Sequence, residues 1–597
     1  MRKIVMRPAI AGRSGAARSP GRWGRLLGAA LALGVLVALG GCSRSDSAQL
    51  DAKRRIGAIR ADGVFEGGRL RYAETDFHAQ GQGRPGGVLR VAVSSDTHTF
   101  DIHASSSGNM QWLGRILYDC LVAQDEKGDI SPWLATSWDI SPDGLTYTFH
   151  LRQGVTFSDG TPFDAEAVRV NLDHMRDPRI KSPLAAFYIA PYDHGEVVSA
   201  YVFRAHLRQP YAPFLDVLAQ SWLGMISPKQ IRETPKSIID KPIGTGPFVL
   251  KEYLRDQYAK FERRADYDWS PPVLRHQGPA YIDRLELYFV PEALIRYSAL
   301  LAGQYDVTLD VPPQNAEAVR ANPDFELHSR IRKGNPTRVL TFNTQRPPFD
   351  DPRIRLALAK AVDREGIAWI QGFGEFRVKS DYLAANTRHY DPRWRDALQY
   401  DPAAANRLLD EAGWTARDAE GFRVKDGKRL HAEVLQSGGS GASTSAAVAL
   451  QSDARKIGFE LTLRLLPQQQ LTSPRMTGDY QVLGGSGYWH TNTPDGLTML
   501  YHSQAIPSEK VIAQNASRLQ DPALDDLLTR ARGTTDPDKQ KALYSQAQQR
   551  LTELVPSVPT YESHAISAWR KKVKGILFDT SHNVPVFVNA WFDEGQP

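Results

Sequence analysis

The stretch that decides the fold class is "ATSWDISPDGLTYTFHLRQGVTFSDGTPFDAEAV", residues 135–168, because strand, turn and helix patterns follow one another within it. Apolar and polar residues alternate over residues 145–152, as in a half-buried strand, and place three side chains on one face: Tyr147, Phe149 and Leu151. Asp159-Gly160 predicts a turn. Asp164 then predicts the N-cap of a helix with an apolar face made by Val168, Leu172 and Met175.

Similar strand and helix-cap patterns recur along the chain. Residues 86–93 read as an apolar strand. Asp351 and Asp401 each stand before a proline and an amphipathic run, which predicts two more capped helices, the second ending at Gly413. Strands and helices are therefore mixed, and we predict an α/β protein. The roughly 510 residues from residue 86 onward are too many for one hydrophobic core, so we expect at least two domains.

The N-terminus has the pattern of a cleaved leader. The apolar run at residues 26–39 is 14 residues long, whereas a membrane-spanning helix needs about 20. Seven basic residues and no acidic residue precede it, as in a secretory signal. Leu39-Gly40-Gly41-Cys42 resembles a bacterial lipobox, which implies cleavage before Cys42 and lipidation of that residue. An ordinary secretory leader with a chance cysteine is the alternative. We expect residues 1–41 to be the leader and residues 42–85 a tether.

Charge and cysteine content follow from this leader. Removing its seven positive charges from the net charge of +6 leaves −1 on the mature chain. Phosphate contacts need a basic surface, so nucleic acid is a poor candidate partner. If Cys42 is lipidated, Cys120 is the remaining thiol and no intramolecular disulfide can form. Cys120 lies in an apolar run and is predicted to be a buried small hydrophobe.

Motifs for catalysis are scarce. The sequence contains no GxSxG, HExxH, P-loop or CxxC motif. One GxGxxG, at residues 81–86, precedes a strand instead of opening a helix, so it does not predict a dinucleotide site. His98 and His103 lie five residues apart, which is weak evidence for ligand or metal contact, with a solvated loop as the alternative. We predict no catalytic residue, no metal and no cofactor.

Six further stretches, read with residues 135–168, resemble in order the blocks of the family 5 extracellular solute-binding proteins, the peptide, nickel and oligosaccharide receptors of ABC importers. They are "IGTGPFVLKEY" (243–253), "LLAGQYDV" (300–307), "FNTQRPPFDDPRIRLALAKAVDRE" (342–365), "YDPAAANRLLDEAG" (400–413), "VPSVPTYE" (555–562) and "RKKVKGILFD" (570–579). The last is similar to the tail of the dipeptide receptors. In these blocks we expect core aromatics at Trp138, Phe149 and Phe157, and backbone turns at Gly160, Gly244 and Gly246.

The resemblance implies a fold and a function. The fold would be of the two-lobed periplasmic-binding-protein type (type II, large family 5 form), with an inserted second lobe and a ligand cleft between the lobes. Residues 86–335 and a C-terminal return over 556–597 would form lobe I, and residues 336–555 lobe II. A monomer would capture a peptide or peptide-like solute and deliver it to an ABC permease complex. It would do so at the extracytoplasmic face of a bacterial membrane, where the lipid on Cys42 would anchor it.

The ligand residues are expected in two loops of lobe II. The peptide receptors carry a W-x-x-D block, whose aspartate pairs with the ligand ammonium. Here "GYWHTNTPDG" has Trp489 in register, beside Tyr488, but Asn492 at the aspartate position. Asp495 could replace the aspartate after a small shift. The second loop, residues 435–447, lacks the arginine that binds the peptide carboxylate in dipeptide receptors, but offers Ser437 and Ser440. The alternatives are a receptor for a nickel chelate or metallophore, an opine or an oligosaccharide, and a secreted lipoprotein hydrolase.

Overall fold

The computed structural model describes residues 63–66, 69–72 and 83–593, with gaps at 106, 126–127, 181, 183, 335–336, 439–440, 486–490, 492, 509–512 and 579–584. The predicted leader, Cys42 and most of the predicted tether lie outside these residues. Within the tether range, β1 (Gly63–Glu66) and β2 (Arg69–Tyr72) form an antiparallel hairpin. None of the helices in the described residues is long and apolar enough to cross a membrane.

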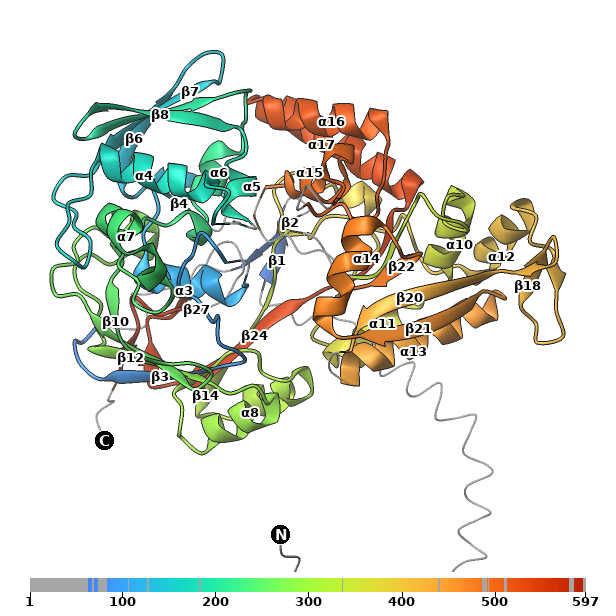
Figure 1. The fold of residues 1–597 in the computed structure, drawn as a ribbon. Helices are drawn as coiled ribbons and strands as arrows, with labels where there is room; N and C mark the ends of the chain where they lie inside the picture. Colours follow the sequence, from blue (N-terminus) through green and yellow to red (C-terminus); the bar gives the residue numbers. More distant parts are fainter. Residues whose placement is uncertain are drawn as a thin grey trace, which may run out of the picture. The chain divides into compact units, whose positions relative to one another are not determined.

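The first lobe is built on a seven-stranded mixed sheet (Figure 1). Its strands, in spatial order, are β10 (Phe248–Leu254), β11 (Tyr258–Arg263), β12 (Arg284–Phe289), β3 (Val88–Val93), β13 (Val307–Thr308), β24 (His564–Arg570) and β14 (Phe325–Ile331). Strands β12, β3 and β13 run parallel, and β24 lies antiparallel between β13 and β14. Strand β24 therefore comes from the C-terminal part of the chain, whereas the other strands of this sheet all end by Ile331.

A four-stranded antiparallel sheet completes the first lobe, in the order β6 (Ala135–Ile140), β7 (Thr146–Leu151), β9 (Val202–Leu207) and β8 (Tyr192–Ser199). Three small strand pairs accompany it: β4 (Val122–Gln124) with β5 (Ile130–Pro132), β25 (Val573–Lys574) with β28 (Trp591–Phe592), and β26 (Leu577–Phe578) with β27 (Pro585–Val586). The helices are α3 (Asn109–Leu117), α4 (Ala165–Arg176), α5 (Ala185–Tyr188), α6 (Phe214–Leu218), α7 (Pro228–Glu233), α8 (Ala293–Leu301) and α9 (Ala316–Ala321).

The second lobe is built on a six-stranded sheet, in the order β16 (Arg377–Val378), β23 (Ser557–Glu562), β15 (Thr337–Phe342), β22 (Val482–Gly484), β20 (His431–Ser437) and β21 (Glu460–Leu466). A three-stranded sheet joins β17 (Ala416–Arg417), β18 (Arg423–Lys425) and β19 (Lys428–Arg429). The helices are α10 (Pro352–Ala361), α11 (Arg364–Gly372), α12 (Pro402–Glu411), α13 (Gly441–Lys456), α14 (Thr472–Thr477), α15 (Gly496–Tyr501), α16 (Pro522–Gly533) and α17 (Pro537–Leu554).

Short 3₁₀ turns connect these elements. They are Ser221–Leu223, Pro235–Ile239, Pro272–Leu274, Pro313–Asn315, Pro392–Trp394, Gln468–Leu471 and Ser503–Ala505.

The helix caps and the buried strand face predicted from the sequence are confirmed. The side chains of Asp164, Asp351 and Asp401 each accept a hydrogen bond from a backbone N–H of the first helical turn that follows. Alternate residues of β7 are buried, and Phe149 and Phe157 lie in the first core, whereas Trp138 packs against it partly buried. Cys120 is fully buried in the same core, as predicted.

The glycines of the "IGTGPF" block have a different role from the predicted turn. The backbone N–H of Gly246 donates to the carbonyl of Leu117 at 2.9 Å. A Cβ atom on Gly246 would lie 2.4 Å from the carbonyl carbon of Leu117, and one on Gly244 would lie 2.1 Å from its oxygen. These positions need glycine because another backbone approaches closely, and neither has a positive φ.

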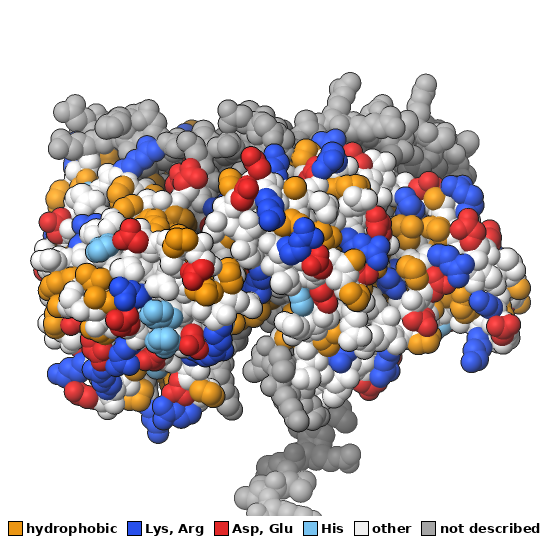
Figure 2. All heavy atoms as spheres, turned by 90° about the horizontal axis from the view of Figure 1, so that it is seen from above, with side chains coloured by type: hydrophobic (Ala, Val, Ile, Leu, Met, Phe, Trp, Pro, Cys, Tyr) orange, Lys and Arg blue, Asp and Glu red, His pale blue; other side chains and the backbone are white. Residues whose placement is uncertain are grey.

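Each lobe buries its own hydrophobic core. The first core draws on the strands and helices up to Leu309 and on the C-terminal segment from Ala565 onward. The second core draws on residues between Ile331 and Tyr561. Phe187, next to Tyr188 in α5, is half-buried and packs against both cores. On the face drawn in Figure 2, acidic and basic side chains are interspersed without a broad patch of one sign.

Candidate functional site

The chain crosses between the lobes twice, and the two crossings lie side by side. The first runs from β14 to β15, and the second passes from β23 to β24 through Ser563. The backbone N–H of Arg332 donates to the carbonyl of Ser563 at 2.9 Å. Ile331 pairs with His564 on one side of this bond and Thr337 pairs with Tyr561 on the other. The crossings therefore form one antiparallel ribbon, about which the lobes can move.

Buried charges support this ribbon from the second lobe. Lys379 lies 2.9 Å from Asp381 and 3.8 Å from Glu562, and all three side chains are fully buried. Glu562 also accepts a hydrogen bond from the backbone N–H of Ala385 at 2.6 Å. Burial raises the pKa of Asp381 to about 6, although Lys379 acts in the opposite direction. The end of β23 is thus anchored to the second lobe immediately before the crossing.

A polar cluster joins the lobes away from the crossings. Tyr211, in the first lobe, donates its hydroxyl to Asp495 Oδ2 at 3.0 Å. Arg532, at the end of α16, donates to the same oxygen at 3.1 Å, and its guanidinium lies 4.8 Å from the Tyr211 ring centre. The backbone N–H of Ala212 donates to the carbonyl of Arg532 at 2.8 Å. The Tyr211 hydroxyl bond, the cation–π contact and the backbone hydrogen bond cross the interface, and the Asp495–Arg532 charge pair lies on its second-lobe side.

An ion pair also crosses this interface. Arg388 Nη2, in the second lobe, lies 2.9 Å from Asp216 Oδ1 in α6. The same guanidinium donates to the carbonyl of Gly128, and Gln124 donates its amide to Asp216 at 2.6 Å. The carboxylate of Asp216 therefore accepts hydrogen bonds from donors of both lobes.

Burial and charge shift the pKa values in this interface. Burial raises the pKa of Asp216, and the charge of Arg388 opposes that rise. Burial raises the pKa of the Tyr211 phenol well above its usual value, and nearby Asp495 raises it further. Burial lowers the pKa of Arg532, but Asp495, Tyr211 and Tyr544 together outweigh it, so the net shift is upward. Tyr211 therefore keeps its proton and acts as a hydroxyl donor.

The two loops predicted to bind ligand emerge from neighbouring strands. Strands β20 and β22 are parallel neighbours, with Leu435 opposite Leu483, so their ends meet at one edge of the sheet. Ser437 closes β20 and is half-buried. The segment after β22 leads into α15, and Asp495 precedes that helix. Ser440, Tyr488, Trp489 and Asn492 lie outside the described residues.

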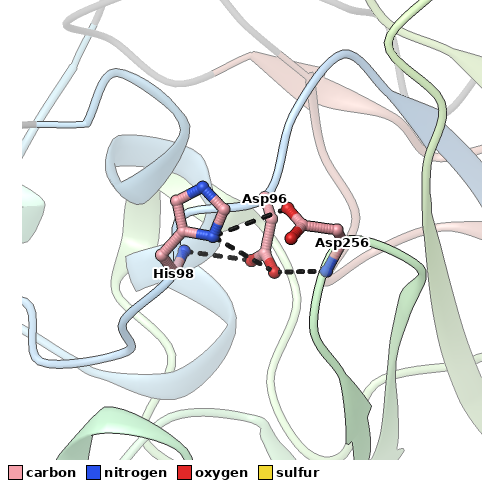
Figure 3. A group of neighbouring side chains, drawn as sticks. All are labelled: Asp96, His98 and Asp256. Atoms are coloured by element: carbon pink, nitrogen blue, oxygen red, sulfur yellow. Dashed lines mark hydrogen bonds and ion pairs between the residues drawn. The ribbon is translucent and has the colours of Figure 1, made fainter.

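The structure separates the two histidines of the predicted pair. His103 is fully buried in the first lobe, where its Nδ1 lies 2.9 Å from His174 Nδ1 and its Nε2 lies 2.9 Å from the carbonyl of Gly224. Burial lowers the pKa of His103 well below its usual value. His98 instead projects from the first lobe beside Asp96 and Asp256 (Figure 3).

Two pockets formed by described residues each lie within one lobe. One, of about 530 Å³, is lined in the second lobe by residues that include Leu435, Leu466 and Tyr480. The other, of about 340 Å³, is lined in the first lobe by residues that include Ser158, Lys251 and Asp266. Four of the residues predicted to bind ligand are described, and none of the four lines either pocket: Ser437, Asp495, His98 and His103.

Sequence reasoning missed the residues that join the lobes: Tyr211, Asp216, Arg388 and Arg532. They stand far apart along the chain and share no motif, since Tyr211 and Asp495 are separated by 284 positions. Only the fold brings them together.

An inserted lobe joined to the first by paired crossings defines the class of two-lobed receptors that enclose a solute between their lobes. A family model described as "Bacterial extracellular solute-binding proteins, family 5 Middle" matches residues 129–507, and the chain belongs to that family. It is a solute-binding protein of an ABC importer, as the resemblance implied. The predicted α/β, two-lobed fold is confirmed.

Relatives of known structure and function agree with this assignment. The glutathione-binding protein GsiB of Salmonella paratyphi A is 27% identical over 505 residues, which cover 82% of this chain and 92% of that protein. NikA from Brucella suis, solved in complex with Fe(III)-EDTA, has a TM-score of 0.74 and 26% identity, and the match covers 85% of this chain and 100% of NikA. The periplasmic binding protein DppA from Helicobacter pylori, solved with the peptide STSA, has a TM-score of 0.71 and 26% identity over 86% of this chain and 100% of DppA.

Proposed function

We propose that this protein is a lipid-anchored receptor that encloses a small peptide-like solute and presents it to a membrane permease. Its ligand would carry a neutral, blocked or displaced group where an ordinary peptide has its α-ammonium. One observation carries the ligand part of this proposal: the carboxylate of Asp495 is already engaged. It is buried and accepts hydrogen bonds from Arg532 and Tyr211.

An ordinary peptide would bring a positively charged α-ammonium into its binding site. An ammonium buried without a carboxylate partner is expensive. Asn492, at the position of the aspartate in peptide receptors, offers a neutral amide, and Asp495 is neutralised by Arg532. A neutral amide binds an ammonium more weakly than a carboxylate does. Glutathione is a suitable first probe, because its γ-linked first residue displaces the α-ammonium and because a relative is named for binding it.

Calorimetry with a panel of ligands tests this proposal. Wild type should bind glutathione or an N-acetylated dipeptide more tightly than the matching free dipeptide. Asn492→Asp should improve binding of the free dipeptide by roughly 10- to 100-fold, since it restores a charged partner. Gln399→Glu adds the same charge at an exposed position of the second lobe and should change nothing. Tight binding of free dipeptides by wild type, unchanged or weakened in Asn492→Asp, contradicts the proposed role of Asn492.

The identity of the cargo is open to direct measurement. A mass spectrum of the compound released on unfolding the purified protein should reveal a peptide-like molecule bound intact. A metal chelate, an opine or a sugar would instead support the alternative cargoes; one relative was solved with Fe(III)-EDTA. We propose that the protein has no catalytic activity, so steady turnover of any test substrate would contradict the receptor function.

We also propose the arrangement of the chain in the cell envelope. The lipid on Cys42 would hold the receptor at the extracytoplasmic face of the membrane, where the permease lies. Residues 86–335 and the C-terminal segment would act as one lobe and the inserted segment as the other. Strand β23 belongs to the sheet of the second lobe and β24 to the sheet of the first. This favours a chain crossing back to the first lobe at Ser563, between these strands, over a crossing at residue 556.

A further inference from the structure

Three side chains of the first lobe converge on one point with the ligand types of a metal site. His98 Nδ1 lies 3.6 Å from Asp256 Oδ1 and 3.8 Å from Asp96 Oδ2. One candidate ligand atom from each of the three residues lies within 4.8 Å of the other two. Figure 3 shows the imidazole and both carboxylates facing one another.

The spacing suits a first-row transition metal ion. Zinc bonds of about 2.0–2.2 Å to nitrogen and oxygen place tetrahedral ligand atoms roughly 3.4 Å apart. The observed separations of 3.6 and 3.8 Å exceed this by a few tenths of an ångström, and the side chains of His98 and Asp256 are exposed and have room to adjust. One imidazole with two carboxylates suits ions such as Zn²⁺, whereas Ca²⁺ and Mg²⁺ require oxygen ligands throughout.

Asp96 is held in place by neighbours that act as an outer shell. Its side chain is fully buried, and its Oδ2 accepts hydrogen bonds from the Tyr253 hydroxyl at 2.6 Å and the Asp256 backbone N–H at 2.9 Å. Its Oδ1 accepts a bond from the His98 backbone N–H at 3.1 Å. Such outer-shell bonds fix the orientation of a metal-binding carboxylate.

The charges of the cluster also favour a cation. Two carboxylates face each other here, and among the described residues no Lys or Arg nitrogen pairs with either of them. The guanidinium of Arg255 donates instead to the backbone carbonyl of His98, at 3.4 Å. A divalent ion would neutralise both carboxylates at once.

The backbone directs the exposed ligands toward Asp96. His98 and Asp256 both have left-handed backbone conformations, with φ of 57° and 58°. His98 follows β3, and Asp256 lies in the turn between β10 and β11. Because β11 is antiparallel to β12, and β12 is parallel to β3, this turn and the end of β3 share one edge of the sheet. Two segments more than 150 residues apart are thereby brought together.

We propose that Asp96, His98 and Asp256 form a site for a divalent first-row transition metal ion, with remaining coordination positions open to solvent. The site is formed by the first lobe alone and is separate from the contacts that join the lobes. A bound ion would tie the segment after β3 to the β10–β11 turn and would stabilise the first lobe through linkage.

Zinc binding to the full mature chain, prepared without a histidine tag, tests the site. Calorimetry should give one high-affinity Zn²⁺ per chain, and the unfolding temperature should rise with Zn²⁺. His98→Asn and Asp256→Asn each remove a ligand while retaining a residue that tolerates left-handed φ. Each should weaken Zn²⁺ binding by at least about 10- to 100-fold, the loss typical even of outer-shell changes.

His150→Asn is the matched control, because His150 lies 3.2 Å from Asp139, is similarly exposed and belongs to no such cluster. It should bind Zn²⁺ like wild type. Failure of wild type to bind Zn²⁺, unchanged binding in both cluster variants, or equal loss in His150→Asn would overturn the proposal. Binding of Ca²⁺ as tight as that of Zn²⁺ would overturn the assignment to a transition metal.

Discussion

The guanidinium of Arg388 and the carboxylate of Asp216 form an ion pair 2.9 Å long across the interface between the two lobes. The Asp216 side chain is 8% exposed and that of Arg388 is 26% exposed, so the pair is substantially desolvated. A second junction, from Tyr211 to Asp495, crosses the same interface. Contacts of this kind exist only while the lobes are together, so they bias the equilibrium between open and closed forms.

Breaking the ion pair should therefore favour the open form. Asp216→Asn and Arg388→Gln should each enlarge the radius of gyration of the ligand-free protein in small-angle scattering. They should weaken ligand binding by roughly tenfold, because the ligand must then supply the lost coupling energy. Arg208→Gln removes an exposed pair with Asp193 inside the first lobe and should change neither quantity. Unchanged scattering and affinity in both interface variants would show that the pair does not control closure.

Asp119 should make the free energy of unfolding of the protein depend on pH. It is fully buried and accepts hydrogen bonds from Trp269 at 2.8 Å and Tyr267 at 3.2 Å. Burial raises the pKa of Asp119 from 3.8 to about 6, although these hydrogen bonds oppose the rise. The folded state then holds more protons than the unfolded state between about pH 4 and pH 6, so this group's contribution to stability falls as pH rises through that window.

Replacing the carboxyl by its neutral isostere should remove this dependence. The free energy of unfolding of Asp119→Asn, relative to wild type, should increase between pH 4 and pH 7 by on the order of 3 kcal/mol. Urea unfolding at four pH values measures it, with the exposed Asp240→Asn as the control. A pH-independent difference between Asp119→Asn and wild type would show that Asp119 is ionised throughout.

Gly246→Ala should destabilise the first lobe through a steric clash, since Gly246 does not have a positive φ. The added Cβ would lie 2.4 Å from the carbonyl carbon of Leu117 and 2.7 Å from the carbonyl oxygen of Ile116. Backbone atoms at a helix end cannot yield as a side chain can, so we expect a loss of about 1–3 kcal/mol in the free energy of unfolding. Gly108→Ala, where a Cβ meets nothing within 4 Å, should stay near wild-type stability. Equal stability of both variants would contradict the close approach.

Cys42→Ser tests the lipid anchor. The short apolar run ending in Leu39-Gly40-Gly41 predicts that Cys42 is the lipidated first residue of the mature chain. The variant should be released from membranes or accumulate as uncut precursor, as read by fractionation and mass spectrometry. Cys120→Ala changes the other cysteine, which is buried, and should leave membrane attachment intact. A Cys42→Ser protein that stays on the membrane with its leader removed would disprove the lipoprotein assignment.

Local features of this protein could be predicted from its sequence because their causes are local. A capping aspartate such as Asp164 acts within one helical turn, and the burial of Phe149 follows from alternation along one strand. The family blocks extend along most of the chain, so the two-lobed fold could also be predicted. The glycines of "IGTGPF" were recognised as special, but the cause, a neighbouring backbone at Leu117, lies far away along the chain.

The tertiary structure alone decided which polar side chains meet. Tyr211, Asp495 and Arg532 come from three separate segments, and Asp96 and Asp256 from two. The sequence paired His98 with His103 because they are close in number, yet the fold buries His103 against His174 and places His98 beside two aspartates. Side-chain chemistry is set residue by residue, whereas an interface or a metal cluster depends on how strands far apart in sequence share one edge of a sheet.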